Sequence, residues 1–265
     1  METRTSSTTF KKLTISKLEQ SNVVIISPKK FLALSGSLIS FFLAAHFVGI
    51  SLINNYPGLH IAKMVNKFFN LDYEATFPSF FSAILLFFSA LLSFLISTQK
   101  NIVKYHKHWL VLGFVLLFLC LDEATSIHEE FIGEIQVRLF EQRGFSDLNG
   151  FLYFGWVIPY ALLIAAVGLY FFKFVLSLPS KIRNLFILAG CVYISGALGC
   201  ELIEGYYKKN DPSDTIMMGL YISVEEILEM CGLSIFVYAL LYHIGSLNIE
   251  LNFGKGQRKS SPKIN

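Results

Sequence analysis

Six long apolar segments follow one another along the chain and are separated by short polar stretches. A helix that crosses a bilayer needs about 20 apolar residues, and each segment reaches or approaches that length. The pattern therefore predicts an all-α fold, an integral membrane bundle of six transmembrane helices. We expect these helices over residues 31–53, 77–98, 109–128, 152–176, 184–206 and 216–244.

Polar stretches at both ends predict a simple domain organisation. Residues 1–30 and 247–265 should form two tails, and residues 31–246 should form one transmembrane domain. Most of the 22 Lys and Arg residues lie in the tails, in the connection between helices two and three, and near that between helices four and five. Basic residues tend to stay in the cytoplasm, so we expect both termini there.

Composition supports this class of protein and excludes others. The chain is 54% hydrophobic and 15% charged, whereas soluble domains carry about 25% charged residues. Glycine-rich phosphate loops and nucleic-acid-binding features are absent from the sequence, so the expected partners are membrane lipids and no nucleic acid. The four cysteines are scattered through apolar segments and form no disulfide framework. The oligomeric state stays open.

Three acidic clusters interrupt or border the apolar segments. Charges in hydrocarbon are costly, so such residues face the bundle interior or water and usually mark a site. The clusters are Asp122, Glu123, His128, Glu129 and Glu130 in the first, Glu201 and Glu204 in the second, and Glu225, Glu226 and Glu229 in the third.

Counting residues along the helices places these clusters at a common depth. The 14 residues from His108 to Asp122, and the 14 from His243 back to Glu229, each correspond to about 21 Å of helix. The hydrocarbon core is about 30 Å thick, so the acids should lie below the outer surface. Helical spacing also aligns Asp122 with Glu129 and Glu123 with Glu130, whereas His128 is off both stripes, so that it and Glu129 would need a break or rotation of the helix to join the site. We expect an outward-facing, water-accessible pocket lined by helices three, five and six.

Small residues in the fifth and sixth helices are candidates for close packing around this pocket. Cys191, Ser195 and Gly199 recur every four residues, with Gly196 beside them, and such a stripe allows neighbouring helices to approach closely. Gly232 follows Glu229 and is expected to loosen the sixth helix.

So many carboxylates cannot all stay ionised in a low dielectric unless protons, basic side chains or a metal ion relieve them. Oxygen-rich ligand sets with few histidines suit Mg, Ca, Mn or a di-iron centre. Glu-x-x-His, the motif of di-iron bundles, does not occur. We expect a divalent metal or a two-metal centre of Fe, Mn or Zn. The candidate ligands are Asp122, Glu123, His128, Glu129, Glu201, Glu204, Glu225 and Glu229, with His46 as a further possibility.

Three stretches carry a family resemblance: residues 69–82 (FNLDYEATFPSFFS), residues 121–130 (LDEATSIHEE) and residues 225–232 (EEILEMCG). They resemble uncharacterised bacterial multi-pass membrane proteins with a Leu-Asp-Glu…His-Glu motif. The resemblance implies a bacterial plasma membrane location and no particular activity. It also draws attention to Asp72 and Glu74, which are placed either to reach the pocket mouth or to favour the start of the second helix.

Three functions fit these observations. The first is a membrane-embedded metalloenzyme that acts on a lipid or another apolar substrate. The second is a cation- or proton-coupled transporter, because intramembrane acids are equally typical of that class; a polar path through the cytoplasmic half and an inverted repeat are not visible in the sequence. The third is an accessory or scaffold subunit whose acids pair among helices. Enzymatic activity is left open, and the first function is preferred.

Overall fold

The computed structural model describes residues 26–127, 157–210 and 215–247, and these residues are helical apart from short connections. Six helical segments are long and apolar enough to cross a membrane, as predicted. The helices are α2 (Pro28–Asn55), α3 (His60–Phe69), α4 (Phe77–Ser97), α5 (His106–Thr125), α7 (Val157–Ser177), α8 (Ser180–Ile194), η4 (Ser195–Cys200), α9 (Glu201–Asn210) and α10 (Thr215–Ser246).

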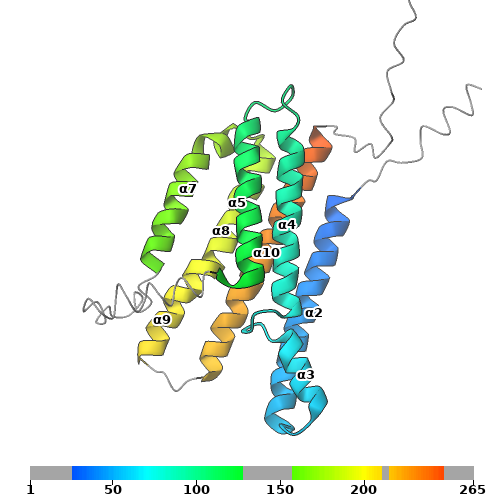
Figure 1. Cartoon of the computed structure of the whole chain (residues 1–265), viewed down its shortest axis with the longest axis vertical. Coiled ribbons are helices and arrows are strands. Elements are labelled where there is room, and N and C mark those ends of the chain that lie inside the picture. The colour runs from blue at the N-terminus through cyan, green and yellow to red at the C-terminus, as the bar shows by residue number, and fades with distance from the viewer. Residues whose placement is uncertain (1–25, 128–156, 211–214, 248–265) are drawn as a thin grey trace, which may run out of the picture.

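Helix α10 is the central element of the bundle. It packs against α2, α4, α8, η4 and α9, while α5 packs mainly against α4 and α3 against α2. Helix α7 lies at the periphery (Figure 1), where Leu162 and Leu169 are 68% and 78% exposed. The start of α2 and the end of α10 lie at the same end of the bundle, as an even number of spans requires. The membrane side that this end faces stays a prediction.

Aromatic rings fill the bundle at this same end. The Trp109 ring is 1% exposed, and its centroid lies 5.0 Å from that of Phe174, 5.7 Å from Phe186 and 5.3 Å from His243. These residues join α5, α7, α8 and α10. Close-packed rings leave little room for water between the described helices at this end.

Two features differ from the sequence-based expectation. Helix α5 ends at Thr125, because Ser126 adopts the left-handed conformation with φ 52°. The helix therefore ends three residues before the predicted boundary at residue 128. The alignment of Asp122 with Glu129 stays a prediction, because His128, Glu129 and Glu130 lie outside the described residues. The second feature is α3, a ten-residue amphipathic helix. It was not predicted, because its sequence contains no apolar segment of membrane-spanning length.

Candidate functional site

Three carboxylates from two helices converge beside the middle of the bundle. Glu201 and Glu204 lie in the first turn of α9, and Glu225 lies on α10. One carboxylate oxygen from each lies within 4.8 Å of the other two. Glu204 is buried and the others are half-buried, and the Glu204 and Glu225 carboxyl groups lie within hydrogen-bonding reach of each other. We call these three residues the glutamate triad.

The local backbone explains how the triad forms. The π-helical turn η4 immediately precedes α9, and single π turns inside α-helices are frequent at functional sites because they widen the helix and reorient the residues that follow. Glu201 and Glu204 are three residues apart and therefore share one face of α9. That face meets α10 at Glu225.

Two glycines hold η4 and α8 close against α10. A Cβ atom on Gly196 would lie 2.8 Å from the carbonyl oxygen of Glu225 and 3.1 Å from Cγ of Glu229. A Cβ atom on Gly232 would lie 2.7 Å from the backbone nitrogen of Tyr193. The distances of 2.8 Å and 2.7 Å are too short for a Cβ atom. The backbones of η4 and α8 therefore touch the backbone of α10 close to Glu225 and Glu229.

This seam confirms the close approach at Gly196 and corrects the rest of the expected small-residue stripe. Cys191 and Ser195 are exposed, and a Cβ atom on Gly199 would have no neighbour closer than 3.9 Å. The stripe therefore points away from the contact, and Gly196 makes the close approach instead. Gly232 does not loosen α10, which is continuous from Thr215 to Ser246.

A second group of acids adjoins the triad. Glu229 on α10 accepts a hydrogen bond from the Tyr193 hydroxyl of α8. Glu229 also interacts electrostatically with Glu123 at the end of α5 and with Glu74 from the α3–α4 connection. Glu225 interacts with both Glu229 and the other two triad members. Electrostatic interactions therefore link members of all three acidic clusters among the described residues, and we call these linked residues the acid layer.

The candidate ligands can now be placed individually. Glu201, Glu204 and Glu225 form the triad; Glu229 and Glu123 lie in the adjoining group, with Asp122 beside Glu123. His128 and Glu129 lie outside the described residues. The candidates placed above lie on α5, α9 and α10; a water-accessible pocket between the third, fifth and sixth spans stays a prediction.

His46 does not belong to this layer. Its Nδ1 accepts a hydrogen bond from the Leu71 backbone N–H at 3.1 Å, so in the neutral ring Nε2 carries the proton. Nε2 lies 3.1 Å from Oγ of Ser223, whose hydroxyl in turn donates to the Gly219 carbonyl at 2.7 Å. Both ring nitrogens are occupied, so His46 ties α2, the α3–α4 connection and α10 together and has no lone pair for a metal.

Three residues of the layer were absent from the expected ligand set. Glu226 interacts with Glu229, Glu123 and Glu74; it was visible in the third acidic cluster. Glu74 was noted only for its position before the second span. Nothing in the sequence indicated that Tyr193 belongs to the site, apart from its lone hydroxyl in an apolar segment, because its role depends on the contact with α10.

An all-carboxylate group of this kind can hold a hard divalent cation. Oxygen ligands are preferred by Mg, Mn and Ca, and carboxylates also bind ferrous iron in di-iron proteins. The triad contains no histidine or thiolate, which makes it a poorer match to the nitrogen and sulfur ligands that zinc often takes.

Comparison with known proteins gives one match. No curated protein and no solved structure matches the chain. One family model, described as a domain of unknown function (DUF8692), matches residues 38–244. The match covers most of the chain and reaches into all six spans, and it agrees with the resemblance to an uncharacterised family; the bacterial origin and the Leu-Asp-Glu…His-Glu motif stay predictions. The chain belongs to the DUF8692 family.

Proposed function

We propose that this protein is a membrane-embedded metalloenzyme whose glutamate triad binds a divalent cation. The bound ion would act as a Lewis acid on a lipid or another apolar substrate. The observation that carries the proposal is the convergence of Glu201, Glu204 and Glu225, whose oxygens lie within 4.8 Å of one another.

This spacing suits a single ion. Oxygen ligands lie about 2.0 to 2.6 Å from Mg or Ca, so two ligands on opposite sides of one ion are about 4 to 5 Å apart. The triad needs little rearrangement to reach that geometry. Glu226 and Glu229 interact with Glu225 of the triad, and Glu123 interacts with both of them. These three acids could supply ligands for a second ion.

Electrostatics supports the same proposal. Glu204 is 7% exposed, and several carboxylates gathered between apolar helices repel one another. A divalent cation offsets this repulsion, and burying like charges without a counterion is strongly unfavourable. The close helix contact at Gly196 then holds the ligands in place before the ion binds.

The enclosed aromatic end of the bundle favours an enzyme over a transporter. A transporter needs a polar path to both membrane surfaces in turn. Trp109, Phe174 and Phe186 pack closely across the half of the bundle away from the triad. Because aromatic rings fill that end, we expect a substrate to reach the triad from the other end, which suits chemistry at one leaflet. The distribution of basic residues favours the outer leaflet.

Metal content tests the proposal directly. The full chain is purified in detergent, incubated in turn with Mg, Ca, Mn, Fe or Zn salts, washed, and measured by inductively coupled plasma mass spectrometry. We expect about one ion or two ions per chain and a loss of at least one ion in Glu225→Gln. Asp122→Asn removes a carboxylate from the far end of the layer and serves as the matched control that keeps the triad ion. Wild-type protein that retains no metal, or an equal loss in both variants, would contradict a triad-centred site.

A second measurement separates the enzyme from the transporter. Metal-loaded protein is reconstituted with a total membrane lipid extract, and lipid products and cation flux are followed in the same liposomes. We expect new lipid products that Glu225→Gln does not form. Flux that depends on Glu225, without any lipid product, would favour the transporter.

A further inference from the structure

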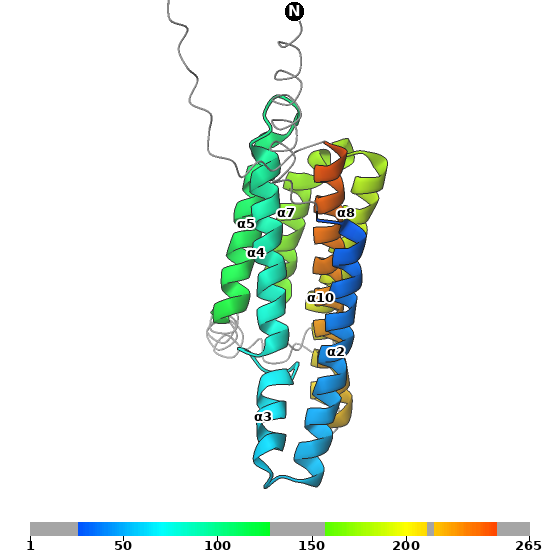
Figure 2. The ribbon, with the colours of Figure 1, turned by 90° about the vertical axis from the view of Figure 1, so that its right-hand side faces the viewer.

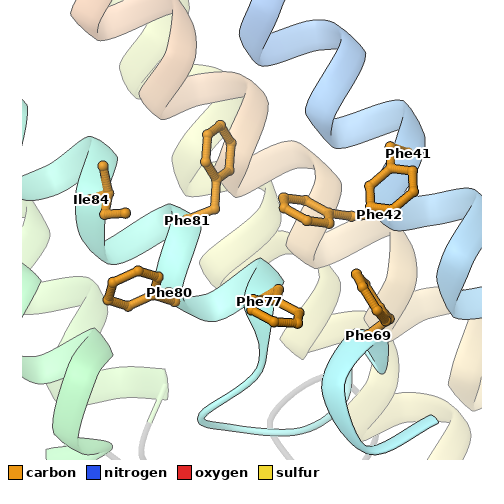
Figure 3. A pocket seen from close by; sticks show the side chains of 7 residues that line it. All are labelled: Phe41, Phe42, Phe69, Phe77, Phe80, Phe81 and Ile84. Carbon is orange, nitrogen blue, oxygen red and sulfur yellow. The ribbon is translucent and has the colours of Figure 1, made fainter. Parts of the chain in front are cut away.

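An apolar groove runs over the surface between α2, the end of α3 and the start of α4. Its volume is about 340 Å³, within the usual range of small-molecule sites. Six phenylalanines and Ile84 line it (Figure 3). Phe42 at its inner wall is 7% exposed, whereas Phe41 and Phe80 are 54% and 63% exposed. The groove is therefore open at the surface and closed toward the bundle.

The groove's position along α4 sets its depth in the membrane. Helix α4 has 21 residues, which gives a length of about 31 Å and matches a hydrocarbon core of about 30 Å. The groove occupies the first two turns of α4, from Phe77 to Ile84. We therefore expect the groove to lie just inside the hydrocarbon core, next to the head groups of one leaflet. Helix α3 lies beyond the start of α4 along the bundle axis (Figure 2), so we expect it at the level of the lipid head groups.

Basic residues mark the head-group end of the groove. Lys63 and Lys67 are four residues apart on α3 and are exposed. The Lys67 ammonium lies 5.8 Å from the centroid of the Phe68 ring. That ring lies 5.8 Å from the ring of Phe77, which forms one wall of the groove. The positive charge of Lys67 thus lies next to the outer end of the apolar groove.

We propose that this groove binds one acyl chain of an anionic phospholipid and that Lys67 contacts its phosphate. An apolar slot within the hydrocarbon and a cation at the phosphate level match the two parts of such a lipid. A neighbouring helix is a poorer occupant, because close helix packing in membranes uses small residues over several turns and this groove is walled by phenylalanines. The proposal does not depend on the metal site.

Charge reversal at Lys67 tests the head-group contact. Lipid binding to the full chain in detergent is titrated by native mass spectrometry with phosphatidylglycerol and with phosphatidylcholine. We expect Lys67→Glu to weaken phosphatidylglycerol binding by about fivefold or more, since one basic residue near the membrane surface contributes that much. The matched control is Lys104→Glu: Lys104 is also exposed and lies 5.6 Å from the Tyr105 ring, but it stands at the opposite end of the bundle.

A second pair of variants tests the chain-binding part. Phe41 and Phe80 are largely exposed, so Phe41→Ala with Phe80→Ala should fold normally while it weakens binding of both lipids in equal proportion. In parallel, the fluorescence of a Phe80→Trp variant should be quenched by phosphatidylglycerol with brominated acyl chains, and less so when Lys67→Glu is added. Equal phosphatidylglycerol binding by the two lysine variants would overturn the proposal, as would unchanged binding by the double alanine variant. A protein dimer that dissociates on the double substitution would assign the groove to a second copy of the chain and overturn it too.

Discussion

Gly196 and Gly232 control how closely the acid-bearing helices approach each other. Each lies where a methyl group would collide with the backbone of the neighbouring helix. Backbone atoms cannot move aside as a flexible side chain can, so the whole helix would have to shift. Because the triad draws its carboxylates from both sides of this seam, a shift of the helices also separates the ligands.

We predict that Gly196→Ala destabilises the protein by about 1 to 3 kcal/mol, the usual cost of overpacking. The midpoint of thermal unfolding in detergent should fall by about 2 to 4 °C per kcal/mol. The control is Gly190→Ala in α8, where a Cβ atom meets nothing within 4 Å; this change should be neutral or raise stability by up to about 1 kcal/mol, because alanine is the better helix former. Equal midpoints for the two variants would contradict a tight seam at Gly196.

Some residues of the site could be predicted from the sequence and others could not. The depth of Glu229 follows from helical rise alone, so its place in the layer was predictable. The contribution of Tyr193 was not, since only the packing of α8 on α10 brings its hydroxyl to Glu229. The roles of Gly196 and Gly199 were also not separable by spacing, because the π turn changes the helical phase between them.

At the scale of elements, the connection between α3 and α4 brings Glu74 into the acid layer. Its backbone is defined by local hydrogen bonds: the Asn70 side chain accepts from the Asp72 N–H at 3.0 Å, and Ser79 Oγ accepts from the Thr76 N–H at 3.0 Å. Thr76 and Ser79 form a capping box that starts α4. Ala75, between Glu74 and Thr76, adopts a left-handed backbone conformation with φ 57°.

Substitution of Ala75 should reveal this strained turn. Left-handed backbone costs alanine about 1 to 2 kcal/mol and is worse for a β-branched residue. Ala75→Val should therefore lower the unfolding midpoint clearly, whereas Ala75→Gly should leave it unchanged or raise it. Ala161→Val, at an exposed position in the regular helix α7, controls for the change of side chain. A midpoint for Ala75→Val no lower than that of Ala161→Val would show that the turn carries no strain.

Hydrophobic length predicted the six spans because a bilayer dictates the number of apolar residues that a helix needs. It could not predict α3, which is ten residues long and amphipathic. Nor could it predict the end of α5 at Thr125, since Ser126 in the left-handed conformation has no apolar signature. Neither feature depends on the length of an apolar segment, so hydrophobic length carries no signal for it.

For the whole molecule, the fold is compatible with two orientations in the membrane, and the distribution of basic residues favours one of them. The connections α4–α5 and α7–α8 lie at the same end as the start of α2 and the end of α10. Because the sequence concentrates Lys and Arg at this end, it should face the cytoplasm. The acid layer would then lie toward the outer surface, and its metal and lipid partners would come from that side.

Cysteine labelling in intact cells tests this orientation. Gly58→Cys in the α2–α3 turn should react with a membrane-impermeant maleimide in intact cells, while Asn101→Cys in the α4–α5 connection should react only after permeabilisation. Gly58 and Asn101 both occupy exposed positions, and a Cβ atom at Gly58 meets nothing within 4 Å. The four native cysteines lie in apolar helices, so the wild-type chain provides the unlabelled background. The reverse labelling pattern would place the acid layer toward the cytoplasm, and the proposed enzyme would then draw its metal ion and its lipid from the inner leaflet.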